Sequence, residues 1–261
     1  MPLFQLTVLA LVQGITEFLP ISSSGHLAAL PHLMAWPDQG LAIDVAVHAG
    51  TLLAVLVYLR HEVAGMIAGL AGRSTPGLRL ALLVILASVP VTVAGFLVLR
   101  HLGDVFRSIE VIAWTTLVFG ILLGIADRSG AKSRRIEAMT WRDALLIGAA
   151  QVLALVPGTS RSGITMTAGL FLGYGRADAA RFSLLLGIPA IAGAAVLTGF
   201  DLYRHGDAAI GLDAVIAGGL AFVSALLVIH LMMAWLARAS FAPFVAYRVL
   251  LGLGLIGWIY L

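Results

Sequence analysis

The residues best suited to chemistry lie in two short polar breaks within otherwise apolar stretches. The first break, 20–26, holds three consecutive serines, a glycine and a histidine. Hydroxyl groups, backbone amides beside a glycine and an imidazole that exchanges protons near neutral pH suit phosphate binding and cleavage. A helix N-cap followed by an interfacial histidine would explain the same pattern structurally. The residues concerned are Ser22, Ser23, Ser24, Gly25 and His26.

A glutamate, Glu17, lies in the apolar run 15–19 just before this break. A carboxylate inside a membrane-buried segment is costly, so a functional role is the default interpretation, and a side chain that reaches the membrane interface is the structural alternative. Gln13 lies one helical turn earlier and would face the same way.

Ser23 and His26 are three residues apart. If the following helix, expected over 27–36, begins inside the break, the two side chains lie on one side of it, within hydrogen-bond reach. Such a pair is what an activated hydroxyl needs.

The second break, 157–163, centres on Arg161. An arginine buried in a membrane needs an anion, and a pair with Glu17 is the structural explanation. A planar guanidinium among hydroxyls and glycine-rich backbone also fits bidentate phosphate recognition. A helix beginning near Gly163 would add the positive end of its dipole. The two explanations are compatible if Glu17 pairs with Arg161 only in the empty site. The hydroxyl residues of this motif are Ser160, Ser162 and Thr165.

Asp44 and His48 form a weaker candidate pair, spaced i, i+4 near the outer end of an apolar span. They could orient a group that touches the substrate. A capping aspartate and a packed histidine explain the same spacing equally well.

The composition excludes an ordinary soluble domain. Of the 261 residues, 61% are hydrophobic and 11% charged, and the mean hydropathy is +1.03, whereas soluble domains carry about 25% charged residues. The apolar stretches lack the period-two alternation of a membrane β-barrel. The absence of cysteine excludes disulfides, thiolate metal sites and a cysteine nucleophile. The net charge of +3 is too small to indicate nucleic acid as a partner. We therefore expect an all-α integral membrane protein.

Six stretches are near the roughly 17–25 residues needed to cross a bilayer. Two further regions, 3–36 and 144–174, contain the breaks. A segment such as 144–156 would reach only about 20 Å, short of a hydrocarbon core of about 30 Å. These regions are expected to form two re-entrant helix–loop–helix pairs that line a polar interior. The six expected spans are 40–59, 80–99, 111–126, 182–200, 214–237 and 243–261.

The two broken regions are related in sequence. Gln13 with the motif 22–25 recurs as Gln151 with the motif 160–163. One re-entrant pair followed by three spans in each half gives an odd number of crossings, so the second half is expected to be inverted. The expected organisation is a single transmembrane domain with repeat 1 over about 1–127, a loop over about 128–142 and repeat 2 over about 143–261.

Arginine and lysine are shared unequally between the two faces of this topology. By the positive-inside rule the richer face is cytoplasmic, which places both termini and the opening of the site on the extracytoplasmic side. The richer face holds Arg60, Arg73, Arg79, Arg128, Lys132, Arg134, Arg135, Arg142, Arg176, Arg181 and Arg238. The other face holds Arg100, Arg107 and Arg204.

The motifs 13–26 and 157–165 together resemble the two signature regions of the bacterial undecaprenyl-diphosphate phosphatases, a family linked to bacitracin resistance. The resemblance covers the whole chain in length, span pattern and motif spacing. It implies removal of the terminal phosphate from a C55 polyprenyl diphosphate in the bacterial cytoplasmic (inner) membrane, giving the monophosphate that carries peptidoglycan and other cell-wall precursors. The lipid bilayer and the polyprenyl diphosphate are the implied partners, and the oligomeric state is left open, with a homodimer as a candidate.

Carried over to this sequence, the family's catalytic positions match Glu17, Ser23, His26 and Arg161. The resemblance also implies a requirement for magnesium or calcium. Gln13 occupies the first site of the family's Gln/Glu-x-x-x-Glu pattern. Glutamine there removes one carboxylate, which leaves Glu17 with few protein partners for a cation. The expected phosphate-contacting residues are Ser22, Ser24, Gly25, Ser160, Ser162 and Thr165.

The mechanism expected from these residues makes Ser23 the attacking hydroxyl and His26 its base. Arg161, the helix ends and a metal ion would stabilise charge on the phosphoryl oxygens, while Glu17 holds the metal or orients His26. A rival assignment makes His26 the nucleophile. The main alternative to an enzyme is a polyprenyl-phosphate flippase or anion transporter, because inverted repeats with broken helices are also typical of secondary transporters.

Overall fold

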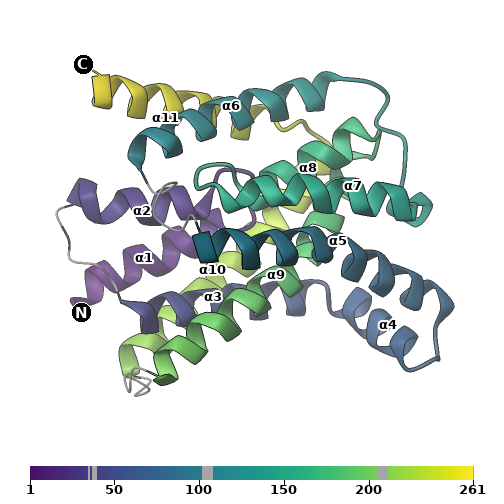
Figure 1. Cartoon of the computed structure of the whole chain (residues 1–261), viewed down its shortest axis with the longest axis horizontal. Helices are drawn as coiled ribbons and strands as arrows, with labels where there is room; N and C mark the ends of the chain where they lie inside the picture. The colour runs from purple at the N-terminus through teal and green to yellow at the C-terminus, as the bar shows by residue number, and fades with distance from the viewer. Residues whose placement is uncertain (35, 37–39, 102–107, 205–210, 261) are drawn as a thin grey trace.

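The computed structural model describes residues 1–34, 36, 40–101, 108–204 and 211–260. Apart from one isolated bridge between Arg134 and Tyr174, the regular structure of this described part is helical, as expected (Figure 1). Of the expected positions, Arg107 and the last residue of the span 243–261 lie outside the described residues, as do the side chains of Arg100 and Arg204. In chain order the elements are α1 (Leu3–Thr16), α2 (Ser23–Met34), α3 (Leu41–Tyr58), α4 (Arg60–Leu70), α5 (Thr75–His101), α6 (Ile109–Arg128), η1 (Ile136–Ala138), α7 (Trp141–Gln151), η2 (Val152–Leu155), α8 (Arg161–Phe171), α9 (Arg176–Arg204), α10 (Leu212–Leu236) and α11 (Ala242–Tyr260).

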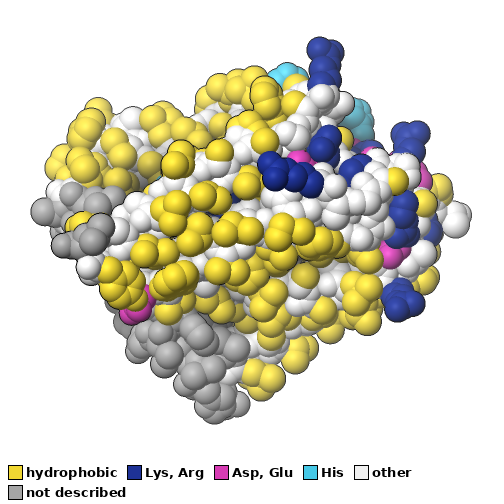
Figure 2. All heavy atoms as spheres, turned by 90° about the horizontal axis from the view of Figure 1, so that it is seen from above, with side chains coloured by type: hydrophobic (Ala, Val, Ile, Leu, Met, Phe, Trp, Pro, Cys, Tyr) yellow, Lys and Arg dark blue, Asp and Glu magenta, His cyan; other side chains and the backbone are white. Residues whose placement is uncertain are grey.

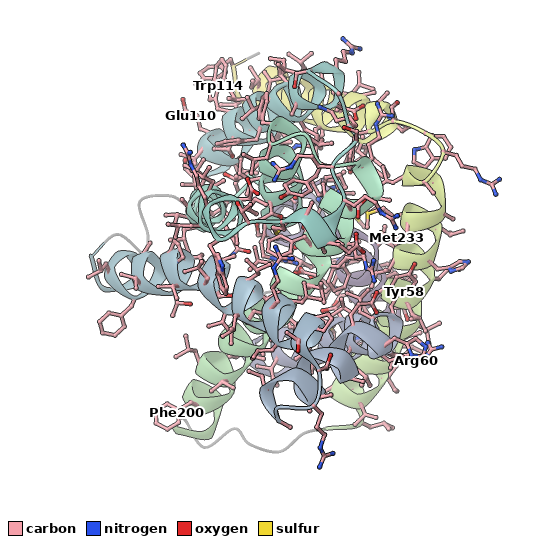
Figure 3. The ribbon with its side chains drawn as sticks, turned by 90° about the vertical axis from the view of Figure 1, so that its right-hand side faces the viewer. Tyr58, Arg60, Glu110, Trp114, Phe200 and Met233 are labelled. Carbon is pink, nitrogen blue, oxygen red and sulfur yellow. The ribbon has the colours of Figure 1, made fainter. Side chains whose placement is uncertain are left out.

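The six expected spans are confirmed as helices long and apolar enough to cross a membrane: α3, α5, α6, α9, α10 and α11. Large apolar side chains on their outer surfaces, such as Trp114 and Phe200, are about half exposed and point outward (Figure 3). A soluble protein would bury such residues, whereas lipid solvates them.

Four spans begin at least two residues earlier than the hydropathy pattern predicts: α5, α6, α9 and α10. Serine residues cap the first two of them. Ser74 accepts a hydrogen bond from the backbone N–H of Gly77 at the start of α5, and Ser108 does the same for Val111 at the start of α6. The short helix α4 was not predicted. It packs so closely on α5 that a Cβ on Gly69 would lie 2.0 Å from the backbone nitrogen of Leu78.

The two broken regions consist of short helices, α1 with α2 and α7 with α8, as expected. The second helix of each pair begins earlier than predicted: α2 at Ser23 rather than residue 27, and α8 at Arg161 rather than Gly163. In both cases the preceding serine reverses the chain with a positive φ, 73° at Ser22 and 70° at Ser160. Such a φ is uncommon outside glycine, and it allows a helix to start directly after the turn.

The two breaks meet in the folded chain. The hydroxyl of Ser162 in the second donates a 2.8 Å hydrogen bond to the carbonyl of Leu19, directly before the first. Both termini lie at the same end of the molecule (Figure 1), and the lysine and arginine side chains gather toward the opposite end (Figure 2).

A buried polar cluster fixes the start of α7 outside the six spans. Asp143 forms a capping box with Thr140, lies 2.6 Å from Arg134, and accepts a 2.8 Å hydrogen bond from the Tyr174 hydroxyl. Burial alone would raise the pKa of the Asp143 carboxyl, but hydrogen bonds from Arg134, Thr140 and Tyr174 outweigh it and hold that pKa well below its usual range. The cluster ties α7 to the turn that follows α8, so both helices that carry the second break are anchored.

Candidate active site

Glu17 lies at the centre of the contact between the two breaks. Its Oε2 atom accepts hydrogen bonds from the Ser23 hydroxyl at 2.7 Å and from the Gln13 amide nitrogen at 3.0 Å. Its Oε1 atom lies 3.5 Å from Nη2 of Arg161. The Glu17 side chain is 9% exposed and that of Arg161 15%, so each charge is compensated mainly by the other.

Arg161 is also held by α9, which the sequence motifs did not indicate. Its Nη1 atom donates to the carbonyl of Ser183 at 3.3 Å. Gly187, one turn further along α9, leaves room for the guanidinium, since a Cβ there would lie 2.7 Å from Nη1. The arginine is therefore aimed at the first break by a neighbouring span.

These residues border a cavity of about 210 Å³. Hydroxyls from both breaks, one carboxylate and one guanidinium converge on it, and three residues of α9 form an apolar side. This combination suits a phosphate attached to an apolar chain. The lining residues are Glu17, Ser22, Ser23, Ser24, His48, Ala154, Ser160, Arg161, Ala190, Ile191 and Ala194.

His26 faces away from Ser23, so the expected hydrogen bond between them does not form in the described structure. Its Nδ1 atom lies 2.7 Å from the carbonyl of Ser22, and its Nε2 atom lies 2.5 Å from the Tyr247 hydroxyl. The reason is the early start of α2: Ser23 is its first residue and turns back toward Glu17, whereas His26 lies a turn further along and stacks on Tyr247 with ring centroids 5.7 Å apart.

His26 and Gly25 border a second, smaller cavity of about 120 Å³ between α1, α2, α6 and α11. Its other lining residues are mostly apolar. Ser22 borders both cavities, so the first turn of α2 forms the wall between them.

Of the remaining predicted residues, most form hydrogen bonds within the protein and do not line the cavity. Ser162 bonds the Leu19 carbonyl, and Thr165 shares a 2.7 Å hydrogen bond with Ser183, so neither reaches the cavity. His48 does line it, and its Nδ1 atom lies 2.7 Å from the main-chain carbonyl of Asp44. Asp44 itself is not among the lining residues.

A divalent cation would find few protein ligands here. Glu17 is the one carboxylate that lines the cavity, and the described residues contain no group of three or more His, Cys, Asp and Glu that could hold a metal. Gln13 donates its amide nitrogen to Glu17, and its buried Oε1 atom has no hydrogen-bond partner. The Glu17 carboxylate and the Gln13 Oε1 atom could bind a hard cation, provided that most of its ligands come from the substrate.

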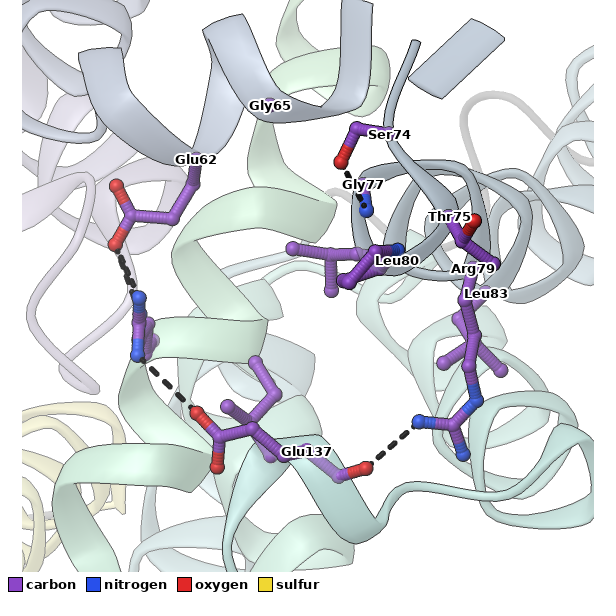
Figure 4. Close-up of a pocket in the computed structure, with 12 residues that line it drawn as sticks. Glu62, Gly65, Ser74, Thr75, Gly77, Arg79, Leu80, Leu83 and Glu137 are labelled. Atoms are coloured by element: carbon purple, nitrogen blue, oxygen red, sulfur yellow. Dashed lines mark hydrogen bonds and ion pairs between the residues drawn. The ribbon is translucent and has the colours of Figure 1, made fainter. Parts of the chain in front are cut away.

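A larger cavity, about 670 Å³, lies elsewhere, between α4, α5, α9 and η1 (Figure 4). Its charges are already engaged with protein groups: Arg181 lies 2.6 Å from Glu62, and Arg79 donates to the carbonyl of Glu137 at 2.7 Å. None of the sequence-predicted site residues borders it. We therefore place the candidate active site in the polar cavity of about 210 Å³ beside Glu17 and Arg161.

Two side chains of α11 that the sequence reasoning missed contact the residues around the site, although neither lines the polar cavity. Tyr247 contacts His26, and Arg248 donates to carbonyls in both breaks. Arg248 could have been found, because an ionisable residue in the apolar span 243–261 invites the argument applied to Arg161. Tyr247 gave no comparable signal.

The fold and the site define a helical membrane protein with a phosphate-sized, hydroxyl-rich cavity where two broken helices meet. Comparison with known protein families agrees with this class of protein. Residues 6–254 match the model of the family described as bacitracin resistance protein BacA, and the chain belongs to this family. It is a multi-pass membrane protein of that family.

Similar proteins extend over the full chain. Undecaprenyl-diphosphatase 1 of Rhodospirillum rubrum is 54% identical over 273 residues, covering 100% of this chain and 96% of the relative. The undecaprenyl-diphosphatase of Ruegeria pomeroyi is 51% identical over 266 residues, covering 100% of both chains. That of Hahella chejuensis is 50% identical over 261 residues, covering 98% of each.

Proposed function

We infer that this protein is an undecaprenyl-diphosphatase, a membrane hydrolase that converts undecaprenyl diphosphate to undecaprenyl phosphate and inorganic phosphate. The observation that carries this inference is the identity of about half of all residues, over the full chain, to proteins of that name. The reaction recycles the lipid carrier of cell-wall synthesis and so opposes bacitracin. The names of these relatives give no support to the transporter alternative.

The contacts of Glu17 support a modified mechanism in which Glu17, rather than His26, is the base for Ser23. The Ser23 hydroxyl would attack the terminal phosphorus while its proton passes to Glu17 Oε2, 2.7 Å away. A new Ser23 O–P bond forms, the bridging P–O bond breaks, and undecaprenyl phosphate leaves. Glu17 passes this proton to the departing phosphate oxygen and is ionised again. Water then attacks the phosphoserine and gives its proton to Glu17, the Ser23 O–P bond breaks, and Glu17 returns the proton to the Ser23 oxygen as inorganic phosphate leaves.

Arg161 would exchange its contact with Glu17 for the equatorial oxygens of the phosphoryl group, where the charge of phosphoryl transfer resides. Ser22, Ser24 and Ser160 line the same cavity and would donate hydrogen bonds to the phosphate. The exchange frees the Glu17 carboxylate to accept the proton. Substrate binding and activation of Ser23 are thereby coupled.

His26 has a supporting role in this proposal. Its contact with the Ser22 carbonyl braces the positive-φ turn that presents Ser23, and Tyr247 holds its other nitrogen. The rival mechanism, with His26 as nucleophile, requires Nε2 to leave the Tyr247 hydroxyl and reach the other cavity.

We propose magnesium or calcium as the cofactor, held chiefly by diphosphate oxygens with Glu17 and Gln13 as the protein groups nearby. Such an ion would add to the positive charge of Arg161 at the phosphoryl oxygens. Asp44 is proposed to act indirectly, through its backbone contact with His48.

The two broken helix pairs are proposed to be re-entrant and related by an inverted repeat. Ser22 and Ser160, at matching positions of the two motifs, share the same unusual φ. Among the described residues, neither pair contains a helix long and apolar enough to span a membrane. The basic end of the molecule is proposed to face the cytoplasm, with both termini and the site opening outside, in the cytoplasmic membrane. A homodimer remains a candidate assembly.

The function is tested by phosphate release from undecaprenyl diphosphate and farnesyl diphosphate in detergent, across metals. We expect release by the wild type, a loss of about 10³-fold or more in Ser23→Ala, as for an essential catalytic group, and loss in His26→Ala and Arg161→Ala. Ser88→Ala is the matched control, because Ser88 bonds only its own helix, α5, through the Val84 carbonyl.

A phosphoenzyme trapped on His26, or substantial turnover by Ser23→Ala, would contradict the serine mechanism. No release by the wild type, together with lipid movement in vesicles, would favour the transporter.

A further inference from the structure

Arg248 on α11 is completely buried, with 0% of the residue exposed, although it lies in an apolar span. Its guanidinium donates only to backbone carbonyls among the described residues. The acceptors are Gly158 at 2.9 Å, Thr159 at 3.0 Å, Thr116 at 3.1 Å, Pro20 at 3.3 Å and Thr115 at 3.5 Å.

These carbonyls come from three different parts of the fold. Pro20 belongs to the first break, Gly158 and Thr159 belong to the second, and the other two acceptors are on α6. Unwound backbone inside a membrane needs partners for its carbonyls, because no bulk water is available there. One side chain therefore satisfies both breaks and fixes the distance between them.

The backbone leaves a tailored space for this side chain. A Cβ on Gly120 of α6 would lie 2.7 Å from the Arg248 Cβ, and a Cβ on Gly163 of α8 would lie 2.8 Å from its Nη1. Alanine at either position would push on the arginine. The Arg248 side chain is therefore closely packed by both α6 and α8.

The charge of Arg248 is not neutralised by any of these contacts. Glu17 and Arg161 compensate one another, and the hydrogen bonds of Arg248 end on neutral carbonyls. The junction of the two breaks thus carries a net positive charge in a medium where an unpaired charge is costly. An anion bound in the adjoining cavity would lower that cost.

We propose that Arg248 is a positioning residue for the phosphatase reaction, which locks the two breaks together and supplies a permanent positive charge behind the bound phosphate. The proposal rests on the proposed function. Arg161 lines the cavity and meets the phosphate directly, whereas Arg248 acts through the main chain that it holds and through its field. Its neighbour Tyr247 extends the same support to His26.

The test compares Arg248→Gln with Arg248→Lys in two assays: turnover of farnesyl diphosphate and thermal stabilisation by inorganic phosphate, which needs no turnover. Arg248→Gln should weaken phosphate affinity by roughly tenfold or more, because a nearby charge in a low-dielectric site is lost. Arg248→Lys should retain most of that affinity. Both should lower kcat by about 10²-fold, the cost of a small misplacement of the catalytic groups.

Equal phosphate affinity in wild type and Arg248→Gln, or unchanged kcat in both variants, would overturn the proposal. If the wild type releases no phosphate, the proposed function fails, and the phosphate-affinity comparison still decides whether Arg248 supplies charge to an anion site.

A second variant covers the outcome that the Arg248 variants do not fold. Gly163→Ala displaces the guanidinium while leaving every charge in place, so kcat should fall while phosphate affinity changes little. Gly254→Ala, on the same helix as Arg248, is the matched control, because a Cβ there meets no heavy atom within 4 Å. Unchanged kcat in Gly163→Ala would also overturn the proposal.

Discussion

Among single side chains, the Glu17 carboxylate is the one that contacts both halves of the site: Ser23 on one side and Arg161 on the other. One oxygen receives the Ser23 hydroxyl and the Gln13 amide, and the other faces Arg161. The ion pair holds Arg161 in place without substrate, but it must open before the guanidinium can grip a phosphate. In the proposed mechanism the same carboxylate is therefore both the base for Ser23 and the internal competitor of the substrate for Arg161.

This competition leads to a specific prediction for Glu17→Gln. Turnover should fall by about 10²–10⁴-fold, the range expected when a general base is removed. Binding of inorganic phosphate should become tighter, because Arg161 loses its internal anion. Phosphate release and thermal stabilisation by phosphate measure the two effects.

Glu110→Gln, at the exposed first turn of α6, is the control for Glu17→Gln. It should leave both quantities unchanged, because the glutamine oxygen can still accept the hydrogen bond from the Tyr260 hydroxyl. Weaker phosphate binding in Glu17→Gln would show that the carboxylate helps to hold the anion rather than competing with it.

The sequence was sufficient to single out Glu17 and Arg161, because an ionisable residue in an apolar run needs a partner. It was not sufficient to pair Ser23 with Glu17 instead of His26. That choice depends on the residue at which α2 begins, which is set by the positive φ of Ser22. A backbone reversal at serine leaves little trace in a sequence, since glycine is the residue normally expected there.

For the helices, the position of each break depends on how closely its first helix approaches a span. A Cβ on Gly148 of α7 would lie 2.3 Å from the carbonyl of Ala87 on α5, and one on Gly14 of α1 would lie 2.7 Å from the carbonyl of Ala221 on α10. Small residues permit such backbone contact between helices in membranes. Each glycine therefore sets the depth of the break that follows it.

We expect Gly148→Ala to destabilise the protein by about 1–3 kcal/mol, the usual cost of overpacking, and to lower kcat because the second break shifts. Thermal unfolding and phosphate release measure these effects. Gly193→Ala on α9, where a Cβ meets no heavy atom within 4 Å, should change neither. An unaltered unfolding temperature in Gly148→Ala would mean that α7 can move away from α5 at no cost.

Hydropathy predicted the six spans well, because length and apolarity are what a bilayer requires. It could not predict α4, whose residues include Arg60 and Glu62 and whose position comes from packing on α5. It also placed the starts of α5 and α6 too late, since their first turns are stabilised by serine caps rather than by lipid.

For the whole molecule, the distribution of charge gives a direction. Both termini lie at one end, and the arginines and lysines are concentrated toward the other. Two ion pairs join the start of α9 to other helices: Arg176 pairs with Asp127 at the end of α6, and Arg181 pairs with Glu62 of α4. These contacts tie α9 to both halves of the chain.

A reporter fused to the carboxyl terminus tests the orientation. A reporter enzyme that works only outside the cytoplasm should be active in this fusion, and a reporter that works only in the cytoplasm should be inactive. The reason is that the basic end stays in the cytoplasm, which places the carboxyl terminus on the other side of the membrane. The same reporters fused after Ser129, at the basic end, should give the reverse result. Cytoplasmic activity of the terminal fusion would refute the proposed topology.

The contacts of Arg248 also set an order of biogenesis. The Pro20 carbonyl is synthesised 228 residues before Arg248, its hydrogen-bond donor. At ordinary rates of translation this interval is on the order of ten to fifty seconds. Until α11 has been synthesised, the broken backbone near Pro20 and Gly158 lacks its buried donor, and the nascent site cannot close. A ribosome that stalls before α11 has been synthesised should therefore leave a chain that is inert and open to proteolysis.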